Sequence, residues 1–328
     1  MMSDQLLPFY VADYFQAREV IHSGQMSDVY FGIDTDSGLP VAIKLIKSLH
    51  PDPIRQELFR RESRALKTLK HNHIVQLVDS GWSDTLEKFY IITQYQGNSL
   101  DKYLQSLRNR SPVTTDNSWY WVMLQGLCDA LAHAHSQHII HRDIKPSNIL
   151  LSDERANHPY LCDFGISKIK GDLAVGQTLR SFTSPGYTAP EILNGEKGDE
   201  RSDIYSLGMI LYEILSGYPP SNEGPTEQEL IDACRQVGNW TQTILTRSTS
   251  LLPENRYQTI QELMRDIELS RQNEYLDDYI IILDAGAVRT LKNLGLIDRE
   301  NMGDAREAVL DQLGGTDANP CYVTDVVD

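Results

Sequence analysis

The stretch HRDIKPSN, residues 141–148, constrains this chain more than any other feature of its 328 residues. It places a carboxylate (Asp143), an ammonium group (Lys145) and a side-chain amide (Asn148) within six residues of one another. A DFG triplet begins twenty residues after Asp143, and GYTAPE follows at 186–191. One short motif is weak support for a function, but three in this order and spacing are highly specific.

Together with VAIK at 41–44, these motifs resemble the signature set of the eukaryotic-type protein kinase family, and the short loops look like its bacterial branch. The resemblance covers about residues 14–270. It implies an α+β, bilobal fold, with a small antiparallel β-sheet lobe plus one helix over about 14–96. A larger, mostly helical lobe follows over about 97–270, and residues 1–13 are an N-terminal extension.

The resemblance also assigns roles to charged residues, because phosphoryl transfer from ATP needs alignment and charge neutralisation more than covalent chemistry. Lys44 is expected to hold the α- and β-phosphates. Its partner is expected to be a glutamate on the following helix. We favour Glu62 over Glu57, because FRRE precedes the HNHIVQL connection at the family's spacing.

By the same resemblance, Asp163 and Asn148 are expected to bind Mg²⁺. Asp143 is expected to accept or orient the proton of the attacking hydroxyl, and Lys145 to neutralise the transferred phosphoryl group. Lys145 also goes with a serine or threonine acceptor in this family, as does a hydroxyl at Ser184. The resemblance thus implies protein substrates phosphorylated on Ser or Thr.

The loop EVIHSGQMSDVYFG, 19–32, has one glycine where the family pattern has three. Aligned on Val29, the three positions are His22, Gly24 and Ser27. Gly24 keeps the middle position, where the backbone comes closest to the phosphates, and Ser27 is tolerable if its φ is negative. Alone the stretch would read as a plain hairpin. With VAIK following, we interpret it as a working phosphate loop.

The adenine site also follows from the resemblance. Val29, Ala42 and Leu150 are expected to enclose the ring, and Gln94–Gln96 to offer backbone hydrogen bonds as the hinge between the lobes. Thr93 is the small residue expected behind the hinge.

Control by phosphorylation is a further expectation. Arg142 precedes Asp143, and in the family such an arginine goes with phosphorylation of the activation segment. Thr178 has the usual spacing before Ser184, with Ser181 and Thr183 as alternates. Ser184 itself is expected to bond to Asp143 and Lys145.

Two structural ties complete the resemblance. Asp203 is expected to anchor the catalytic loop, and Arg256 to pair with Glu191. These ties and GYTAPE argue against a small-molecule kinase of related fold. A pseudokinase scaffold is the other alternative: the missing glycines favour it, whereas the intact residues Lys44, Asp143, Asn148 and Asp163 oppose it.

Hydrophobic periodicity, independent of any family, predicts strands and helices. A strand meander is expected over 14–47 and an amphipathic helix over 53–70. Further strands are expected at 74–82 and 88–95, and helices at 118–138 and 203–216.

Composition bounds the partners. A net charge of −16 and a pI near 4.9 argue against nucleic acid or an anionic membrane and favour basic or neutral proteins. No apolar run reaches the ~18–20 residues of a membrane helix, and no secretory signal is evident, so we expect a cytoplasmic protein. The cysteines, none in a CxxC pair, are expected to be reduced: Cys128, Cys162, Cys234 and Cys321.

Two features remain ambiguous. HAHSQHIIH, 133–141, could suggest a metal site, but the family pattern makes it a helix end leading into the catalytic loop. Residues 271–328 carry twelve acidic and five basic residues yet keep apolar stretches. They are either an extension packed on the helical lobe or a docking element for partners.

Overall fold

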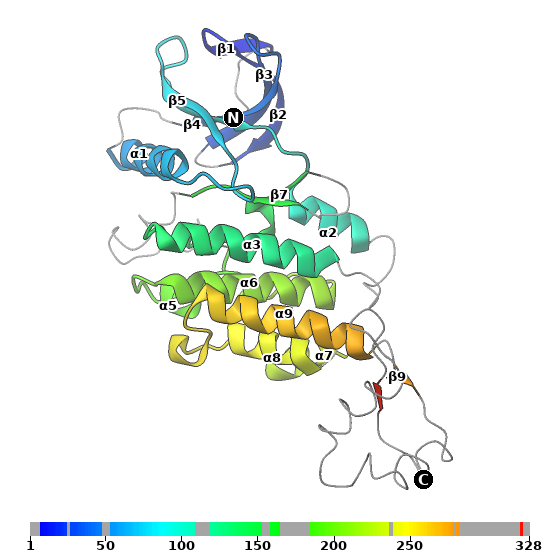
Figure 1. Cartoon of the computed structure of the whole chain (residues 1–328). Coiled ribbons are helices and arrows are strands. Elements are labelled where there is room, and N and C mark those ends of the chain that lie inside the picture. Colours follow the sequence, from blue (N-terminus) through cyan, green and yellow to red (C-terminus); the bar gives the residue numbers. More distant parts are fainter. Residues whose placement is uncertain are drawn as a thin grey trace, which may run out of the picture.

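The computed structural model of the chain describes residues 7–24, 27–47, 53–108, 119–152, 158–164, 184–235, 239–277, 280–281 and 322–323. They form a small lobe that holds a β-sheet and a larger lobe of stacked helices (Figure 1). The expected α+β, bilobal fold is therefore confirmed.

The small lobe is an antiparallel sheet of six strands in the order β1-β2-β3-β4-β6-β5. Strand β3 alternates buried and partly buried residues, as a strand with one packed face does, whereas β4 and β6 contain runs of buried residues. Helix α1 (Pro53–Thr68) contacts β5 and β6, and the expected helix over 53–70 is thus present. The strands are β1 (Phe9–Ala12), β2 (Phe15–Ser23), β3 (Ser27–Asp34), β4 (Pro40–Ile46), β5 (Leu77–Ser83) and β6 (Lys88–Gln94).

Strand β1 lies inside the segment that the sequence analysis treated as an extension. Val11 is buried in the core of the small lobe, and the ring of Phe9 meets the ring of Tyr30 edge to face at 5.2 Å. The strand has four residues, and its register against β2 shifts between Tyr10 and Ala12. So short and irregular a strand gives no alternation that could be read from sequence.

The larger lobe is built around α6 (Glu200–Ser216), which contacts α3, α7, α8 and α9. Its mostly apolar sequence explains this burial. The other elements are α2 (Leu100–Arg108), α3 (Trp119–Ser136), η1 (Pro146–Asn148), β7 (Ile149–Leu151), β8 (Pro159–Leu161), α5 (Pro190–Leu193), α7 (Glu227–Ala233), α8 (Asn239–Ser248), η3 (Pro253–Asn255) and α9 (Ile260–Asp277). The helices expected at 118–138 and 203–216 correspond to α3 and α6.

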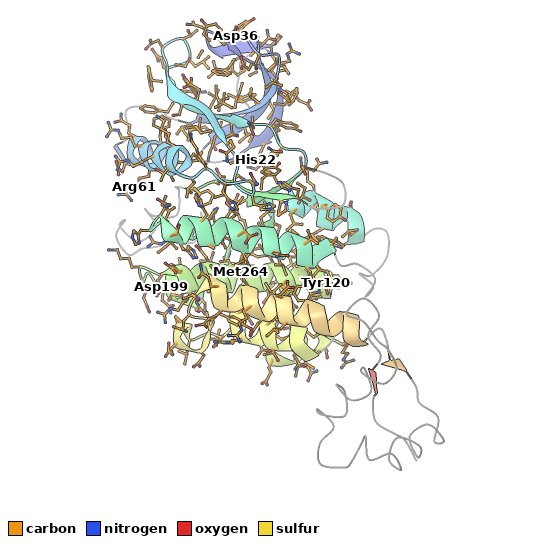
Figure 2. All side chains as sticks on the ribbon, in the orientation of Figure 1. His22, Asp36, Arg61, Tyr120, Asp199 and Met264 are labelled. Atoms are coloured by element: carbon orange, nitrogen blue, oxygen red, sulfur yellow. The ribbon has the colours of Figure 1, made fainter. Side chains whose placement is uncertain are left out.

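Both ends of α6 are capped. The Asp199 carboxylate accepts a hydrogen bond from the Arg201 N–H at 2.9 Å, and Ser202 Oγ accepts one from the Asp199 N–H. Gly217 ends the helix at φ +76°, a conformation that glycine adopts without strain. Asp199 therefore sits at the N-terminal end of the central helix (Figure 2), and Asp203 lies in its first turn, fully buried.

Helix α9 continues to Asp277, past the boundary expected near residue 270. Beyond it, β9 (Ile280–Ile281) pairs in parallel with β10 (Tyr322–Val323). Among the described residues, no helix combines the length and apolarity needed to cross a membrane.

Candidate active site

Lys44 joins the three elements that meet between the lobes. Its ammonium, on β4, donates to both carboxylate oxygens of Glu62 on α1, at 2.9 and 3.1 Å. It also forms a short ion pair with Asp163, which follows β8. Lys44 and Glu62 are 8% and 3% exposed, so the pair is not a surface ion pair. Glu57, the other glutamate weighed from sequence, instead pairs with Arg61 one helical turn away.

The charges of this cluster depend on one another. Burial acts to lower the pKa of Lys44, but the carboxylates of Asp163 and Glu62 outweigh it and raise that pKa. Burial raises the pKa of Glu62 to about 7, against the opposing effect of Lys44. At Asp163 burial is again opposed by Lys44, and here the ammonium prevails and lowers the pKa to about 2. Asp163 is thus held as an anion, the form that binds a divalent cation.

The residues of HRDIKPSN also come together. Asp143 Oδ2 accepts from Lys145 Nζ at 3.1 Å and from Asn148 Nδ2 at 3.2 Å. Asn148 Nδ2 donates to the Asp143 carbonyl as well, at 2.8 Å. Its nitrogen is therefore turned toward Asp143, which leaves the amide oxygen as the end that can bind a cation.

Asp203 holds the backbone that carries these residues. Its carboxylate accepts from the N–H groups of His141 and Arg142, at 2.9 and 2.7 Å, and from His135 Nε2 at 2.9 Å. Burial acts to lower the pKa of His135, but its bond to Asp203 prevails and raises it. His141 Nε2 in turn donates to the Cys162 carbonyl at 2.8 Å.

Two residues here have left-handed backbone: Arg142 at φ +64° and Asp163 at φ +65°. A side chain in this region costs energy, of order 1–3 kcal/mol, and persists only where the surroundings impose it. The bonds from Asp203 to residue 142 and from Lys44 to Asp163 are such constraints.

The residues expected to enclose adenine lie where the lobes join. Ala42 on β4 is the register partner of Thr93 on β6. Val29 on β3 pairs with Lys44. Leu150 on β7 forms a bridge with Ser99, just after the hinge. The hinge begins where the Gln94 N–H donates to the Gln76 carbonyl at 3.0 Å, and Gln96 follows without regular structure.

The phosphate-loop candidate lies at the end of the β2–β3 hairpin. The Gly24 N–H donates to the Ser27 carbonyl at 2.9 Å. His22 is exposed and lies on the side of the small lobe that faces the large lobe (Figure 2). A Cβ added to Gly24 would come within 3.1 Å of His22 Nε2, so a larger residue here would have to displace that ring.

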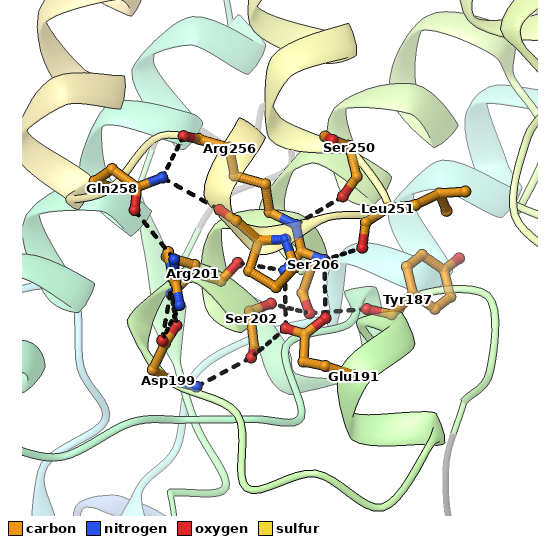
Figure 3. Close-up of polar contacts among 11 residues, drawn as sticks. Tyr187, Glu191, Asp199, Arg201, Ser202, Ser206, Ser250, Leu251, Arg256 and Gln258 are labelled. Carbon is orange, nitrogen blue, oxygen red and sulfur yellow. Dashed lines mark hydrogen bonds and ion pairs between the residues drawn. The ribbon is translucent and has the colours of Figure 1, made fainter.

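Glu191 and Arg256 form a buried bidentate pair (Figure 3), with both bonds at 2.8 Å. Arg256 also donates to the carbonyls of Ser250 and Leu251, and Ser202 donates to Glu191 at 2.7 Å. The pair thus ties the end of GYTAPE to the start of α6 and to the segment before η3.

The residues expected to regulate the site are only partly described. Arg142 Nη2 lies 3.4 Å from the Gly198 carbonyl, and the buried Nε has no hydrogen-bond partner within the described part of the chain. The Ser184 carbonyl accepts from Thr188 Oγ1 at 3.1 Å. The bonds expected from Ser184 to Asp143 and Lys145 stay a prediction. Three further residues lie outside the described ranges: Thr178, Ser181 and Thr183.

Two of the four histidines of 133–141 have other partners: His135 bonds to Asp203 and His141 to the Cys162 carbonyl. Within the described ranges, no group of three or more His, Cys, Asp or Glu side chains is arranged to hold a metal ion.

Sequence reasoning missed His135, Asp28 and Lys47. His135 bonds to Asp203 across 68 positions, and Asp28 to Lys47 across 19. The only local signal was a charged residue between the apolar positions of a predicted strand, which marks Asp28 but not its partner.

Comparisons with known proteins agree with this geometry. The family model described as "Protein kinase domain" matches residues 15–274. The probable serine/threonine-protein kinase PknB of Corynebacterium glutamicum is 31% identical over 287 residues, which cover 81% of this chain and 43% of the relative. Serine/threonine-protein kinase PknB of Mycobacterium tuberculosis is 30% identical over 295 residues, which cover 85% and 46%. The chain therefore spans less than half the length of these curated relatives.

Among solved structures, the Mycobacterium tuberculosis PknI kinase domain matches with a TM-score of 0.63 at 22% identity, covering 81% of this chain and 100% of that one. At this identity the likeness concerns the fold. Because the kinase-domain match includes most of the 328 residues and holds every motif of the site, the chain belongs to the protein kinase family.

Proposed function

We propose that this protein is a serine/threonine kinase that transfers the γ-phosphoryl group of ATP to protein hydroxyls, with Mg²⁺ as its metal. The observation that carries the proposal is Lys44, buried between Glu62 and Asp163. This cluster joins the sheet, α1 and the DFG segment, and those groups must act together on the phosphates of ATP.

The acceptor side of the reaction is assigned to Asp143. Its carboxylate would orient the attacking hydroxyl and receive the proton that the hydroxyl loses as the new P–O bond forms. Lys145, 3.1 Å from Asp143, would neutralise the charge on the transferred group. Asp163 and the amide oxygen of Asn148 would hold Mg²⁺, which supplies positive charge to the phosphates during transfer.

The nucleotide side is assigned to Lys44, with Gly24 in the loop over the phosphates and Val29, Ala42 and Leu150 around the adenine. Lys44 is kept charged by its two carboxylates and is therefore suited to the α- and β-phosphates. The backbone of Gln94 and Gln96 would bind the adenine edge, and Thr93 leaves room behind it.

The test is incubation of the whole chain with labelled ATP and Mg²⁺, with a Ser/Thr-containing protein and a tyrosine-only peptide as separate substrates. We expect label on serine or threonine and none on tyrosine, with Asp143→Asn as the inactive control. Nucleotide binding without transfer would overturn the proposal in favour of a pseudokinase scaffold. Label found only on small metabolites would favour a small-molecule kinase.

We also propose control by phosphorylation of the activation segment at Thr178, with Ser181 or Thr183 as alternates. Arg142 supports this, because its buried Nε lacks a partner within the described residues and a phosphate adds about −1.5 to −2 charge and three acceptor oxygens. Mass spectrometry of active protein should find a phosphate on this segment, and the triple alanine variant should lose activity. An active protein without any phosphate on the segment would contradict this regulation.

A further inference from the structure

A charged network lies at the Gly24 end of the β2–β3 hairpin. Lys47, just after β4, donates to Asp28 Oδ1 at 2.8 Å, to Ser23 Oγ at 3.1 Å and to the Gly24 carbonyl at 2.7 Å. Ser23 Oγ also donates to Asp28. One ammonium and one carboxylate therefore join the ends of β2, β3 and β4. We call these four residues the loop clamp.

The charged side chains of the loop clamp, Asp28 and Lys47, lie on the face of the sheet opposite the proposed nucleotide site. Val29 pairs with Lys44, and Asp28 pairs with Leu45, so Asp28 and Val29 point to opposite faces. Leu45 belongs to the core of the small lobe, and the Asp28 side chain is only 5% exposed. Leu45 lies two residues before Lys47 in the chain, so the side chain of Lys47 points to the same face of the sheet as that of Leu45.

A buried carboxylate is costly unless it is paired and hydrogen-bonded. Asp28 meets this condition through Lys47 and Ser23, so the three side chains hold one another in place. The Gly24 carbonyl is thereby held toward Lys47.

This arrangement matters because the loop lacks two of the three glycines of the family pattern. A loop with several glycines is mobile and loses conformational entropy when it closes over phosphates. A loop already held in shape loses less, and preorganisation of this kind raises affinity. Lys47 contacts both Gly24 and Asp28, so this pair can hold the loop in shape before ATP binds.

We propose that Asp28 and Lys47 are positioning residues. They preorganise the phosphate loop from the face of the sheet opposite the nucleotide and so set the affinity of this protein for the phosphates of ATP. The inference rests on the proposed ATP-dependent function. Neither side chain contacts ATP in this scheme, since both act through Ser23 and Gly24.

The test compares Lys47→Met and Asp28→Asn with Lys47→Arg, which keeps the charge. Lys67→Met is the matched control, because Lys67 is an exposed lysine in the last turn of α1. Binding assays give the Kd of a non-hydrolysable ATP analogue with Mg²⁺ and the Kd of adenosine. Kinetics give kcat and KM for ATP, and urea midpoints report folding of each variant.

We expect Lys47→Met and Asp28→Asn to raise the Kd of the ATP analogue and KM for ATP by about tenfold, or 1.4 kcal/mol, with the Kd of adenosine and kcat unchanged. Lys47→Arg and Lys67→Met should stay near wild type. A defect in folding alone would weaken adenosine binding as well. If the variants lose both ligands together, or lose neither, the inference is wrong.

Failure of the two proposals would look different. A wild-type protein that binds the ATP analogue but transfers no phosphate would refute the proposed kinase activity, while the Kd ratios would still support or refute the loop clamp. A wild-type protein that binds no nucleotide would overturn both.

Discussion

Asp143 and Asp163 are both aspartates, but their carboxylates have different partners. Asp163 is bonded to Lys44, which lowers its pKa to about 2 in spite of burial. Asp143 contacts Lys145 and Asn148 in the catalytic loop. Asp163 is thus held as an anion beside the lysine proposed to bind the phosphates, whereas Asp143 lies beside the lysine proposed to neutralise the transferred group.

We expect Asp143→Asn to lower kcat by roughly 10²–10⁴-fold without weakening ATP binding, because it removes only a proton acceptor. Asp163→Asn should abolish turnover and also remove the gain in ATP affinity that Mg²⁺ gives. The measurement is kcat together with the Kd of ATP, with and without Mg²⁺. Equal losses of Mg²⁺-dependent affinity in both variants would show that these roles are assigned wrongly.

Cys162 differs from the charged residues beside it. Its thiol donates to the Asn148 carbonyl at 3.2 Å, and burial raises its pKa well above the usual range. The reactive thiolate is therefore scarce at pH 8, and each unit of pKa lowers it roughly tenfold. We expect iodoacetamide to label Cys162 slowly in the folded protein and fully in urea, as read by mass spectrometry. Rapid labelling of the folded protein would point instead to a redox-active thiol.

At the scale of elements, the sequence predicted those that carry a long periodic pattern. Helices α1, α3 and α6 were all predicted within a few residues of their ends. Strand β1 was not predicted, because four residues with a shifted register show no alternation. The C-terminal end of α9 was also missed. Mostly polar residues continue the helix past 270, and no Gly or Pro directly follows Asp277 in the sequence to mark its end.

In the candidate site as well, the sequence predicted only what a local pattern or the family resemblance specifies. Local motifs placed Asp143, Lys145 and Asn148 together, because six residues of chain leave few arrangements. The bond of His135 to Asp203 forms only when α3 packs on α6, and that of Asp28 to Lys47 only when β3 pairs with β4. No local pattern specifies such a contact, whereas the family resemblance supplied the pair of Glu191 and Arg256, which lie 65 positions apart.

The Glu191–Arg256 pair joins α5, α6 and the segment before η3, and its loss should destabilise the large lobe. Arg256→Met leaves the Glu191 carboxylate buried without its partner, at an expected cost of about 3–5 kcal/mol. Glu191→Leu combined with Arg256→Met removes both charges and should cost less. Urea unfolding at pH 7 measures both, and equal losses in the two variants would contradict the argument.

This pair also predicts a dependence on pH. Burial acts to raise the pKa of Glu191, but its bonds to Arg256 and Ser202 prevail and lower it below the ordinary value of 4.5. The stability that Glu191 contributes is therefore present above pH 4.5 and is lost as pH falls through the folded-state pKa. The double variant should lack this acid-dependent component in urea unfolding.

At the scale of the whole molecule, the buried cluster of Lys44, Glu62 and Asp163 lies between the lobes. Strand β9 lies beyond the end of α9, at the far end of the large lobe (Figure 1). Residues 271–328 carry a net charge of −7. Since α9 ends at Asp277, a cut after that residue keeps the helix whole, whereas a cut at 270 would remove its last two turns.

We expect a chain ending at Asp277 to fold, and to phosphorylate a short neutral peptide with kcat within about threefold of the full chain, less than 1 kcal/mol of barrier. Its KM for a basic protein substrate should rise, because the acidic segment attracts basic surfaces. That rise should shrink between low and high salt, since exposed charges more than ~10 Å apart are screened at 0.1 M. Kinetics on both substrates at two salt concentrations measure these effects.

A large fall in kcat on the short peptide would show that the segment supports the catalytic lobe itself. An unchanged KM for the basic protein would leave it only a packing role.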